Sequence, residues 1–389
     1  MNGHHRNHIL VLCTSAFFVT MAARLAVSPL TPFVLDEFEI SKSLIGVALT
    51  GMWLAYALTQ YPSGVLGEQH GEKKVILLSL GGVCVMSVLL GLTPVFELFF
   101  VGCILLGGFA GLEYAAATTF LTRKFDRDGR VIGIHAFGAP FAGLVVPVLI
   151  TWIGVRYGWR LAVISTVAVS LPVFVLFYSK VGPTAPTNPT QSFTDSVNLD
   201  IVTELIRQPP ISFSIGIAVV GEFYNQGLIS FLPVFLVQYH GYSATASGAL
   251  FSLFFLGSAL GSVTIGSVSD RFGQDLTIAG CLLLVVVGIA VILTPFSLAP
   301  LLGVTLLAFG TCLVIVVQTR FLDRMTDGDR GTEFGLVRTV YMILGSLGSV
   351  TVGILAESFG WTVAFGLLAA LCVMSMASIA VNRWLQLGL

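Results

Sequence analysis

The sequence predicts an all-α integral membrane protein with twelve transmembrane helices. The chain has 389 residues, of which 56% are hydrophobic and only 10% are charged, whereas about 25% of the residues in an ordinary soluble domain are charged. Its mean hydropathy is +0.93. Apolar runs of about 20 residues can cross a bilayer as helices, whereas the strands of a membrane barrel would be about half as long and would alternate polar with apolar residues.

Twelve apolar runs follow one another along the chain, and each is long enough to be a span. In the first half of the sequence we expect spans near residues 9–35, 44–66, 75–94, 97–121, 131–155 and 160–179. In the second half we expect them near residues 211–238, 245–268, 276–296, 299–319, 334–356 and 362–385.

The two halves are divergent copies of one sequence. The stretch Gly64–Lys74 recurs as Gly266–Asp275 at an offset of 202 residues, and the same offset carries Gly158-Trp159 onto Gly360-Trp361. Further pairs at this offset are Ser41 and Ser243, Gly46 and Gly248, Gly129 and Gly331, Gly133 and Gly335, and Gly143 and Gly345. A parallel duplication in a membrane protein indicates two bundles with a substrate path between them.

One segment has the composition of a linker. Residues 179–210 contain five prolines among Ser, Thr and Asn, which favours turns and irregular chain. We therefore predict a six-helix bundle over residues 1–179, a cytoplasmic linker over 180–210 and a second six-helix bundle over 211–389. Within the linker, Val197–Arg207 spaces its apolar residues at roughly helical period, which predicts a short amphipathic helix on the inner surface.

The distribution of positive charge predicts the orientation of the chain. With the N-terminus inside, the outer loops hold only Lys42, Arg156 and Arg160. The positive-inside rule therefore places both termini in the cytoplasm of a cell membrane. The inner segments hold Arg6, Lys73, Lys74, Arg123, Lys124, Arg127, Arg130, Lys180, Arg207, Arg271, Arg320, Arg324, Arg330 and Arg383.

Other site classes find little support in the sequence. The six cysteines lie in apolar spans without paired spacing, so they are interpreted as small hydrophobic residues and no metal or cofactor is expected. There is no P-loop and no cluster of catalytic groups at a membrane face, so we expect no enzymatic activity. The net charge of −1 does not suggest a nucleic-acid partner.

The repeated stretches resemble the loop signature of the major facilitator superfamily, G-x-x-x-[DE]-[RK]-x-G-x-[RK]-[RK], which lies after spans two and eight. The first copy has Gly64, Glu68, Gly71, Lys73 and Lys74, with Gln69 in place of the usual base. The second has Gly266, Asp270, Arg271 and Gly273 and ends in Gln274-Asp275. The resemblance implies two pseudo-symmetric six-helix bundles that work by alternating access.

In that family the signature loops act as a cytoplasmic gate. Their glycines let helix ends approach closely, and Glu68 and Asp270 are expected to lie near a helix N-terminus or to pair with basic residues. The candidate partners are Arg123, Lys124, Arg130, Arg324 and Arg330. The alternative is that the two stretches are solvated turns.

A narrower resemblance concerns shorter runs of the first half. Arg24–Phe33, Gly111–Tyr114, Phe120–Lys124 and Tyr157–Arg160 look like those of archaeal, halophile-type members of the superfamily. This likeness does not indicate a substrate.

Few ionisable residues lie inside the spans, where a charge costs about 2.5–3.5 kcal/mol and therefore indicates a cavity or a partner. Arg24, Glu113 and Glu222 fall on three of the four spans that line the central cavity in the resembled family. We predict a mid-membrane site of Arg24, Glu222 and Gln226 with Tyr224 and Asn225, in which Glu222 or Glu113 carries a proton. A permanent structural pair of Arg24 with Glu222 is the alternative.

Glu113 has a second interpretation, and two further intramembrane residues, His135 and Arg338, are candidates as well. Glu113 could instead be a gate residue or pair with Arg123 or Lys124. His135 and Arg338 lie about one turn inside the membrane on spans five and eleven, and they are candidates for the proton or substrate pathway. For His135 a hydrogen-bonded structural role is the alternative, and for Arg338 it is snorkelling to the surface.

The resemblance predicts a secondary active transporter of a small solute, coupled to protons and monomeric, with efflux of a drug or metabolite favoured. Two departures weaken efflux: Cys103 or Ile104 stands where drug antiporters have an arginine before Gly107-Gly108, and the Gly-Pro motif of span five is only partly matched. The alternatives are uptake or facilitated diffusion of an organic anion or other metabolite and, in another class, a non-transporting membrane sensor.

Overall fold

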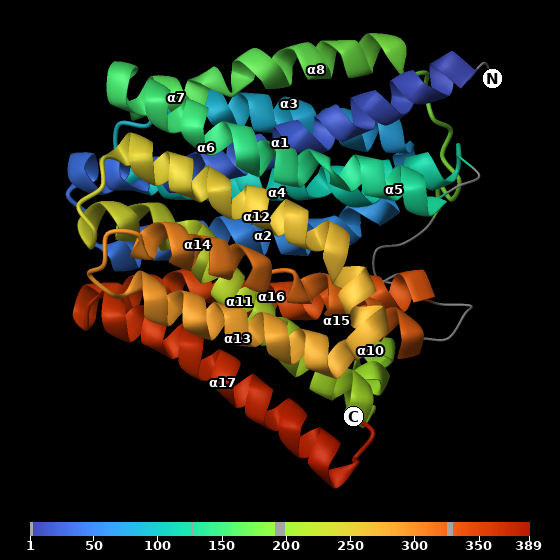
Figure 1. The fold of residues 1–389 in the computed structure, drawn as a ribbon. Coiled ribbons are helices and arrows are strands. Elements are labelled where there is room, and N and C mark those ends of the chain that lie inside the picture. Colours follow the sequence, from blue (N-terminus) through green and yellow to red (C-terminus); the bar gives the residue numbers. More distant parts are fainter. Residues whose placement is uncertain (1–2, 126–127, 191–198, 325–329) are drawn as a thin grey trace. The chain divides into compact units, whose positions relative to one another are not determined.

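A computed structural model describes residues 3–125, 128–190, 199–324 and 330–389, and the regular structure in these ranges is α-helical (Figure 1). Twelve helical segments in this part of the chain are long and apolar enough to cross a membrane, which confirms the predicted spans. The helices of the first half are α1 (Gly3–Phe38), α2 (Lys42–His70), α3 (Glu72–Gly91), α4 (Phe96–Thr122), α5 (Asp128–Ala136), α6 (Gly138–Tyr157), α7 (Trp159–Ser165) and α8 (Val167–Lys180).

The second half repeats this succession. Its helices are α10 (Leu199–Arg207), α11 (Pro209–Gln238), α12 (Ala244–Phe272), α13 (Gln274–Ile292), α14 (Ala299–Gly310), α15 (Leu313–Arg324), α16 (Arg330–Ser358) and α17 (Trp361–Leu385). Helix α10 forms where the amphipathic pattern of the linker predicts a helix, although the first residues of that pattern lie outside the described ranges.

Some spans consist of two helices in succession. Span five is formed by α5 and α6, span six by α7 and α8, and span ten by α14 and α15. The break between α5 and α6 at Phe137 has a local cause, because Pro140 has no N–H to donate to the carbonyl of Ala136, four residues earlier.

The chain divides into two compact units, which are described separately. The first unit comprises Met1–Glu39 and Gly51–Val197, and the second comprises Ile40–Thr50 and Asn198–Leu389. The predicted division at residues 179 and 210 remains a prediction.

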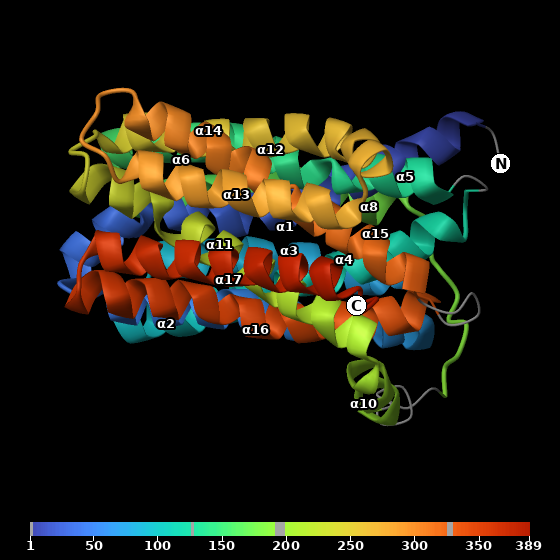
Figure 2. The ribbon, with the colours of Figure 1, turned by 60° about the horizontal axis from the view of Figure 1, so that its bottom comes forward.

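Each unit repeats the same helix contacts. In the first unit α1 packs on α6, α3 packs on α4, and α3 packs on α8. In the second unit the equivalent pairs are α11 with α16, α13 with α14, and α13 with α17, and α13 lies between its two partners in both views (Figures 1 and 2). The duplication read from the sequence therefore extends to the packing inside each unit.

Four glycines at duplicated positions join consecutive helices. Gly71 (φ +88°) and Gly273 (φ +83°) connect spans two to three and eight to nine, and Gly158 (φ +90°) and Gly360 (φ +84°) connect spans five to six and eleven to twelve. Only glycine adopts these backbone angles without strain. The signature stretches are therefore mostly helix ends joined by a single glycine, and the expectation of a loop is corrected there.

Small residues on α12 and α16 lie at close helix contacts. A Cβ added at Gly257 would lie 2.7 Å from the Cβ of Ala308, and one at Gly348 would lie 1.9 Å from the carbonyl oxygen of Phe223. Van der Waals contact at such small residues is a main source of helix association in a bilayer.

Candidate functional site

Among the described residues of the first unit, one arginine, one glutamate and one histidine have completely buried side chains. Arg24 on α1, Glu113 on α4 and His135 on α5 are each 0% exposed. The Nε2 atom of His135 lies 3.9 Å from Oε1 of Glu113, and Glu113 is within electrostatic range of Arg24. We call these three residues the buried polar cluster.

The guanidinium group of Arg24 contacts aromatic rings instead of solvent. Its guanidinium carbon lies 3.6 Å from the ring centroid of Tyr56 and 5.1 Å from that of Trp53, and its Nε donates a hydrogen bond to the carbonyl of Thr20 at 3.2 Å. Cation–π contacts of this kind are strongest when they are desolvated. Arg24 thus keeps a charge inside an apolar bundle.

The side chains of Glu113 and His135 have fewer hydrogen-bond partners than their polar atoms can take. The ring centroid of His135 lies 5.1 Å from that of Phe17 and 5.5 Å from that of Tyr114. Within the described residues, neither carboxylate oxygen of Glu113 and neither imidazole nitrogen of His135 has a hydrogen-bond partner of normal geometry, although the backbone of Cys13 is close to the ring. Buried polar groups in this condition are costly, so the pair is a candidate site for a proton or a solute.

Close packing of α4 against α2 positions the cluster. A Cβ at Gly107 would lie 2.0 Å from the carbonyl oxygen of Met52, and one at Gly111 would lie 2.4 Å from that of Tyr56. The two glycines are one helical turn apart and therefore share a face. They bring Tyr56 to the level of Glu113 and Arg24.

The second unit has its own polar group on α11. The amide of Gln226 donates to Oε1 of Glu222 at 2.5 Å, and a Cβ at Gly345 would lie 2.4 Å from Cγ of Glu222. Arg338 on α16 is within electrostatic range of Glu222 and hydrogen-bonds to Tyr341. Glu222, Gln226 and Arg338 are therefore brought together in the second unit, a grouping of Arg338 with Glu222 that was not predicted from the sequence.

Two neighbouring site predictions have different surroundings. The hydroxyl of Tyr224 donates to the carbonyl of Gly310 at 3.1 Å in a fully buried position, so this side chain anchors α11 to the end of α14. Asn225 is half-buried. Because Arg24 belongs to the first unit and Glu222 to the second, their joint site remains a prediction.

The first signature stretch is tied to the chain that follows α8. The backbone N–H groups of Thr187 and Asn188 donate to the carbonyl of Glu68 at 2.9 and 3.1 Å. The N–H of Lys73 donates to the hydroxyl of Thr184 at 3.0 Å. At Gly71 an added Cβ would lie 2.2 Å from the Thr184 carbonyl oxygen, so close approach requires glycine there, whereas a Cβ at Gly64 would meet no described atom within 4 Å.

The acidic residue that Arg123 binds is Glu72, in the first turn of α3. Arg123 also donates to the hydroxyl of Thr187 at 3.2 Å, and the Glu72 side chain is only 3% exposed. Lys74 is exposed. A buried carboxylate bound to a cation at the C-terminal end of α4 therefore accompanies the signature, and sequence reasoning did not single out Glu72.

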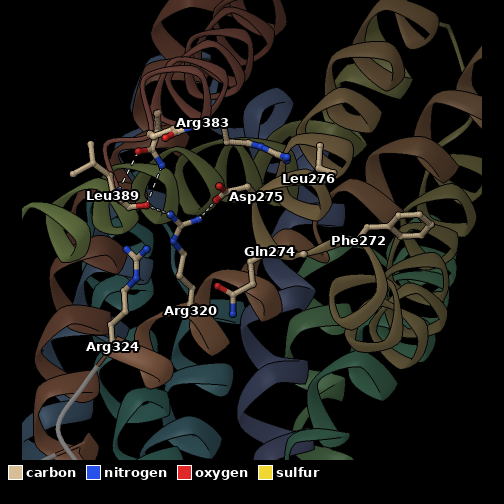
Figure 3. A pocket seen from close by; sticks show the side chains of 12 residues that line it. Phe272, Gln274, Asp275, Leu276, Arg320, Arg324, Arg383 and Leu389 are labelled. Carbon is tan, nitrogen blue, oxygen red and sulfur yellow. Dashed lines mark hydrogen bonds and ion pairs between the residues drawn. The ribbon is translucent and has the colours of Figure 1, made fainter.

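The second signature stretch has an equivalent bond. Asp275, in the first turn of α13, pairs with Arg320 of α15, and Figure 3 shows both side chains beside Gln274. Arg324 donates to the carbonyl of Pro210 at 2.8 Å. Arg271 stacks over Phe272 at 5.4 Å. The departure from the family pattern at Asp275 thus supplies an ion pair inside the second unit. Asp270 is exposed, and Gly266, like Gly64, has open space at its Cβ position.

Comparisons with known proteins agree with this architecture. A family model described as Major Facilitator Superfamily matches residues 12–253 and 217–386. An uncharacterised MFS-type transporter of Bacillus subtilis (strain 168) is 25% identical over 375 residues, which cover 93% of each chain. The hexuronate transporter of the same organism is 22% identical over 389 residues, covering 93% of this chain and 90% of that protein.

A solved structure supports the fold alone. A bacterial homologue of the human lysosomal transporter Spinster, inward-facing and occupied, matches with a TM-score of 0.79 at 17% identity and covers 98% of each chain. The two relatives above are bacterial, and the narrower resemblance to archaeal, halophile-type members remains a prediction.

Proposed function

The chain belongs to the Major Facilitator Superfamily and is a membrane transporter of that type, and from this premise we propose that it moves a small organic anion together with protons by alternating access. The buried polar cluster of the first unit is the proposed site for both. In this proposal the transporter works as a monomer in the cell membrane with both termini in the cytoplasm.

One observation carries the proposal of proton coupling. Glu113 and His135 are fully buried 3.9 Å apart without normal hydrogen bonds among the described residues. Both side chains exchange protons, and ionisable groups inside membrane helices mark ion and proton pathways. Arg24, whose charge reaches Glu113, then links the protonation of that carboxyl to the charge available for a solute.

The proposal of an anionic solute rests on Arg24. A guanidinium recognises carboxylate and phosphate groups with two parallel hydrogen bonds, and protonation of Glu113 would remove a negative charge that acts on Arg24. The similarity to a hexuronate transporter supports the same class. Drug efflux has weaker support, because fully buried Cys103 occupies the region where antiporters have an arginine.

Transport in reconstituted vesicles tests the proposal. With the purified chain in liposomes, we expect uptake of one or more members of a panel of small carboxylates, uronates and sulfonates, and we expect an imposed proton gradient to accelerate it. Glu113→Gln should abolish accumulation against a gradient while solute exchange at equal pH continues. Arg24→Gln should abolish both activities.

Glu97→Gln is the matched control, because Glu97 lies on the same helix, in its exposed first turn, and should leave transport unchanged. If Glu113→Gln retains full dependence on the proton gradient, coupling through the buried polar cluster is wrong. Binding of a panel compound without any flux would instead indicate a sensor.

A further inference from the structure

A polar cavity lies at one end of the second unit, where the N-terminus of α13 meets α15 and the end of α17 (Figure 3). Its volume is about 650 Å³. Three arginines line it, Arg320, Arg324 and Arg383, together with the amide side chains of Gln274 and Asn382. The charge distribution of the sequence predicts that this end is cytoplasmic.

Among the described residues, the three arginines are not all paired with carboxylates, so the cavity carries positive charge. Arg320 is 2% exposed, and its guanidinium binds Asp275 and the carbonyl of Leu389 while its Nε has no hydrogen-bond partner in the described part of the chain. Arg324 donates to two neutral oxygens, the Pro210 carbonyl and the Ser214 hydroxyl. Arg383 is exposed. Asp275 is the one acidic side chain among the residues that line the cavity, and Asp323, outside the lining, accepts a hydrogen bond from Gln274 at 2.8 Å. The side chains that line the cavity therefore carry more positive than negative charge.

An apolar cavity continues from the polar one. Its volume is about 560 Å³, and it lies along α12, α13 and the α14–α15 junction. Phe272 and Leu276 line both cavities, and they are 56% and 50% exposed. Its other walls include Ile265, Val268, Leu284 and Phe309. The surface therefore joins a cationic recess to an apolar groove within one unit.

We propose that this surface binds an anionic phospholipid, with the phosphate of the headgroup at the arginines and an acyl chain in the apolar groove. Arginine binds phosphate oxygens through paired hydrogen bonds, and basic pockets between membrane helices on the cytoplasmic side bind anionic headgroups. The occupant is a lipid rather than free phosphate because the cationic recess and the apolar groove share two exposed walls.

Native mass spectrometry of the purified full chain tests the site. We expect dioleoyl phosphatidylglycerol to bind at least tenfold more tightly than dioleoyl phosphatidylcholine. Dihexanoyl phosphatidylglycerol and inorganic phosphate should bind much more weakly than the long-chain lipid, because neither fills the groove.

Two substitutions address the two halves of the surface. Arg383→Gln should weaken phosphatidylglycerol binding about tenfold, which is about 1.4 kcal/mol, and Arg383→Lys should restore most of it. Arg207→Gln is the control, because Arg207 is also exposed in the second unit but lies outside the cavity. Gly280→Leu places a side chain in the groove, where an added Cβ meets no described atom within 4 Å. It should weaken long-chain binding at least tenfold, whereas Gly366→Leu, at an equally open position of α17, should not.

Three results would overturn the proposal. Equal binding of phosphatidylcholine would remove the role of the arginines. Inorganic phosphate that binds as tightly as the lipid, with no effect of Gly280→Leu, would show a site for free phosphate. Unchanged lipid binding in Arg383→Gln and Arg324→Gln would place the lipid elsewhere.

Discussion

Glu72 is a buried carboxylate that pairs with one cation, Arg123, among the described residues. Its side chain is 3% exposed and bound by Arg123, which is itself 36% exposed. A buried carboxylate that loses its cation retains the cost of its desolvation, whereas removal of both charges removes that cost as well.

A double-mutant cycle measures this dependence. We expect Arg123→Gln to destabilise the purified protein by about 1–3 kcal/mol, and we expect Glu72→Gln combined with Arg123→Gln to be less destabilised than the sum of the single variants. Thermal or denaturant unfolding in detergent is the measurement, with the exposed Arg130→Gln as the control. Strictly additive effects would mean that the two side chains are not coupled.

The sequence identified the members of the buried polar cluster but not their partners. Arg24, Glu113 and His135 stand out because a charge inside an apolar span is rare. The approach of Glu113 to His135 depends on how α4 and α5 are rotated about their axes, and the contact of Arg24 with Tyr56 depends on α2. The contact between α2 and α4 depends on close packing at Gly107 and Gly111, which hydropathy does not record.

At the scale of helices, the α2–α4 contact makes a sharp prediction. An added methyl at Gly107 would lie 2.0 Å from the carbonyl oxygen of Met52, whereas at Gly108 the nearest described atom would be 3.9 Å away. Gly107→Ala should therefore destabilise the protein by about 1–3 kcal/mol, while Gly108→Ala should be neutral or slightly stabilising. Unfolding midpoints compare the two, and equal midpoints would contradict the close packing.

Helices were predicted in number but not in detail. About 20 consecutive apolar residues are enough to indicate a span, so the sequence alone predicts the twelve membrane-spanning segments. The ends of α2 and α12 extend through the charged signature stretches because Gly71 and Gly273 turn the chain in a single residue. Hydropathy alone assigns such charged turns to loops.

At the scale of the whole molecule, the orientation in the membrane is open to direct measurement. The six cysteines are all buried, so background labelling should be low. Lys74, near the start of α3, and Leu92, just after its end, are both exposed. In right-side-out vesicles we expect a membrane-impermeant maleimide to label Leu92→Cys and not Lys74→Cys, and in inverted vesicles the reverse. The opposite pattern would place the termini outside.

The ion pairs Glu72–Arg123 and Asp275–Arg320 lie at similar places in the two units but are not made by equivalent residues of the repeat. Each joins the first turn of one helix to the end of the next span in its own unit, yet the offset of 202 residues would match Glu72 with Gln274 and Arg123 with Met325. The acidic partner has moved by one position and the arginine by five. The two halves therefore form similar ion pairs with residues at different positions of the repeat, so equivalent bonds in this molecule are recognised by where they lie and not by the 202-residue offset.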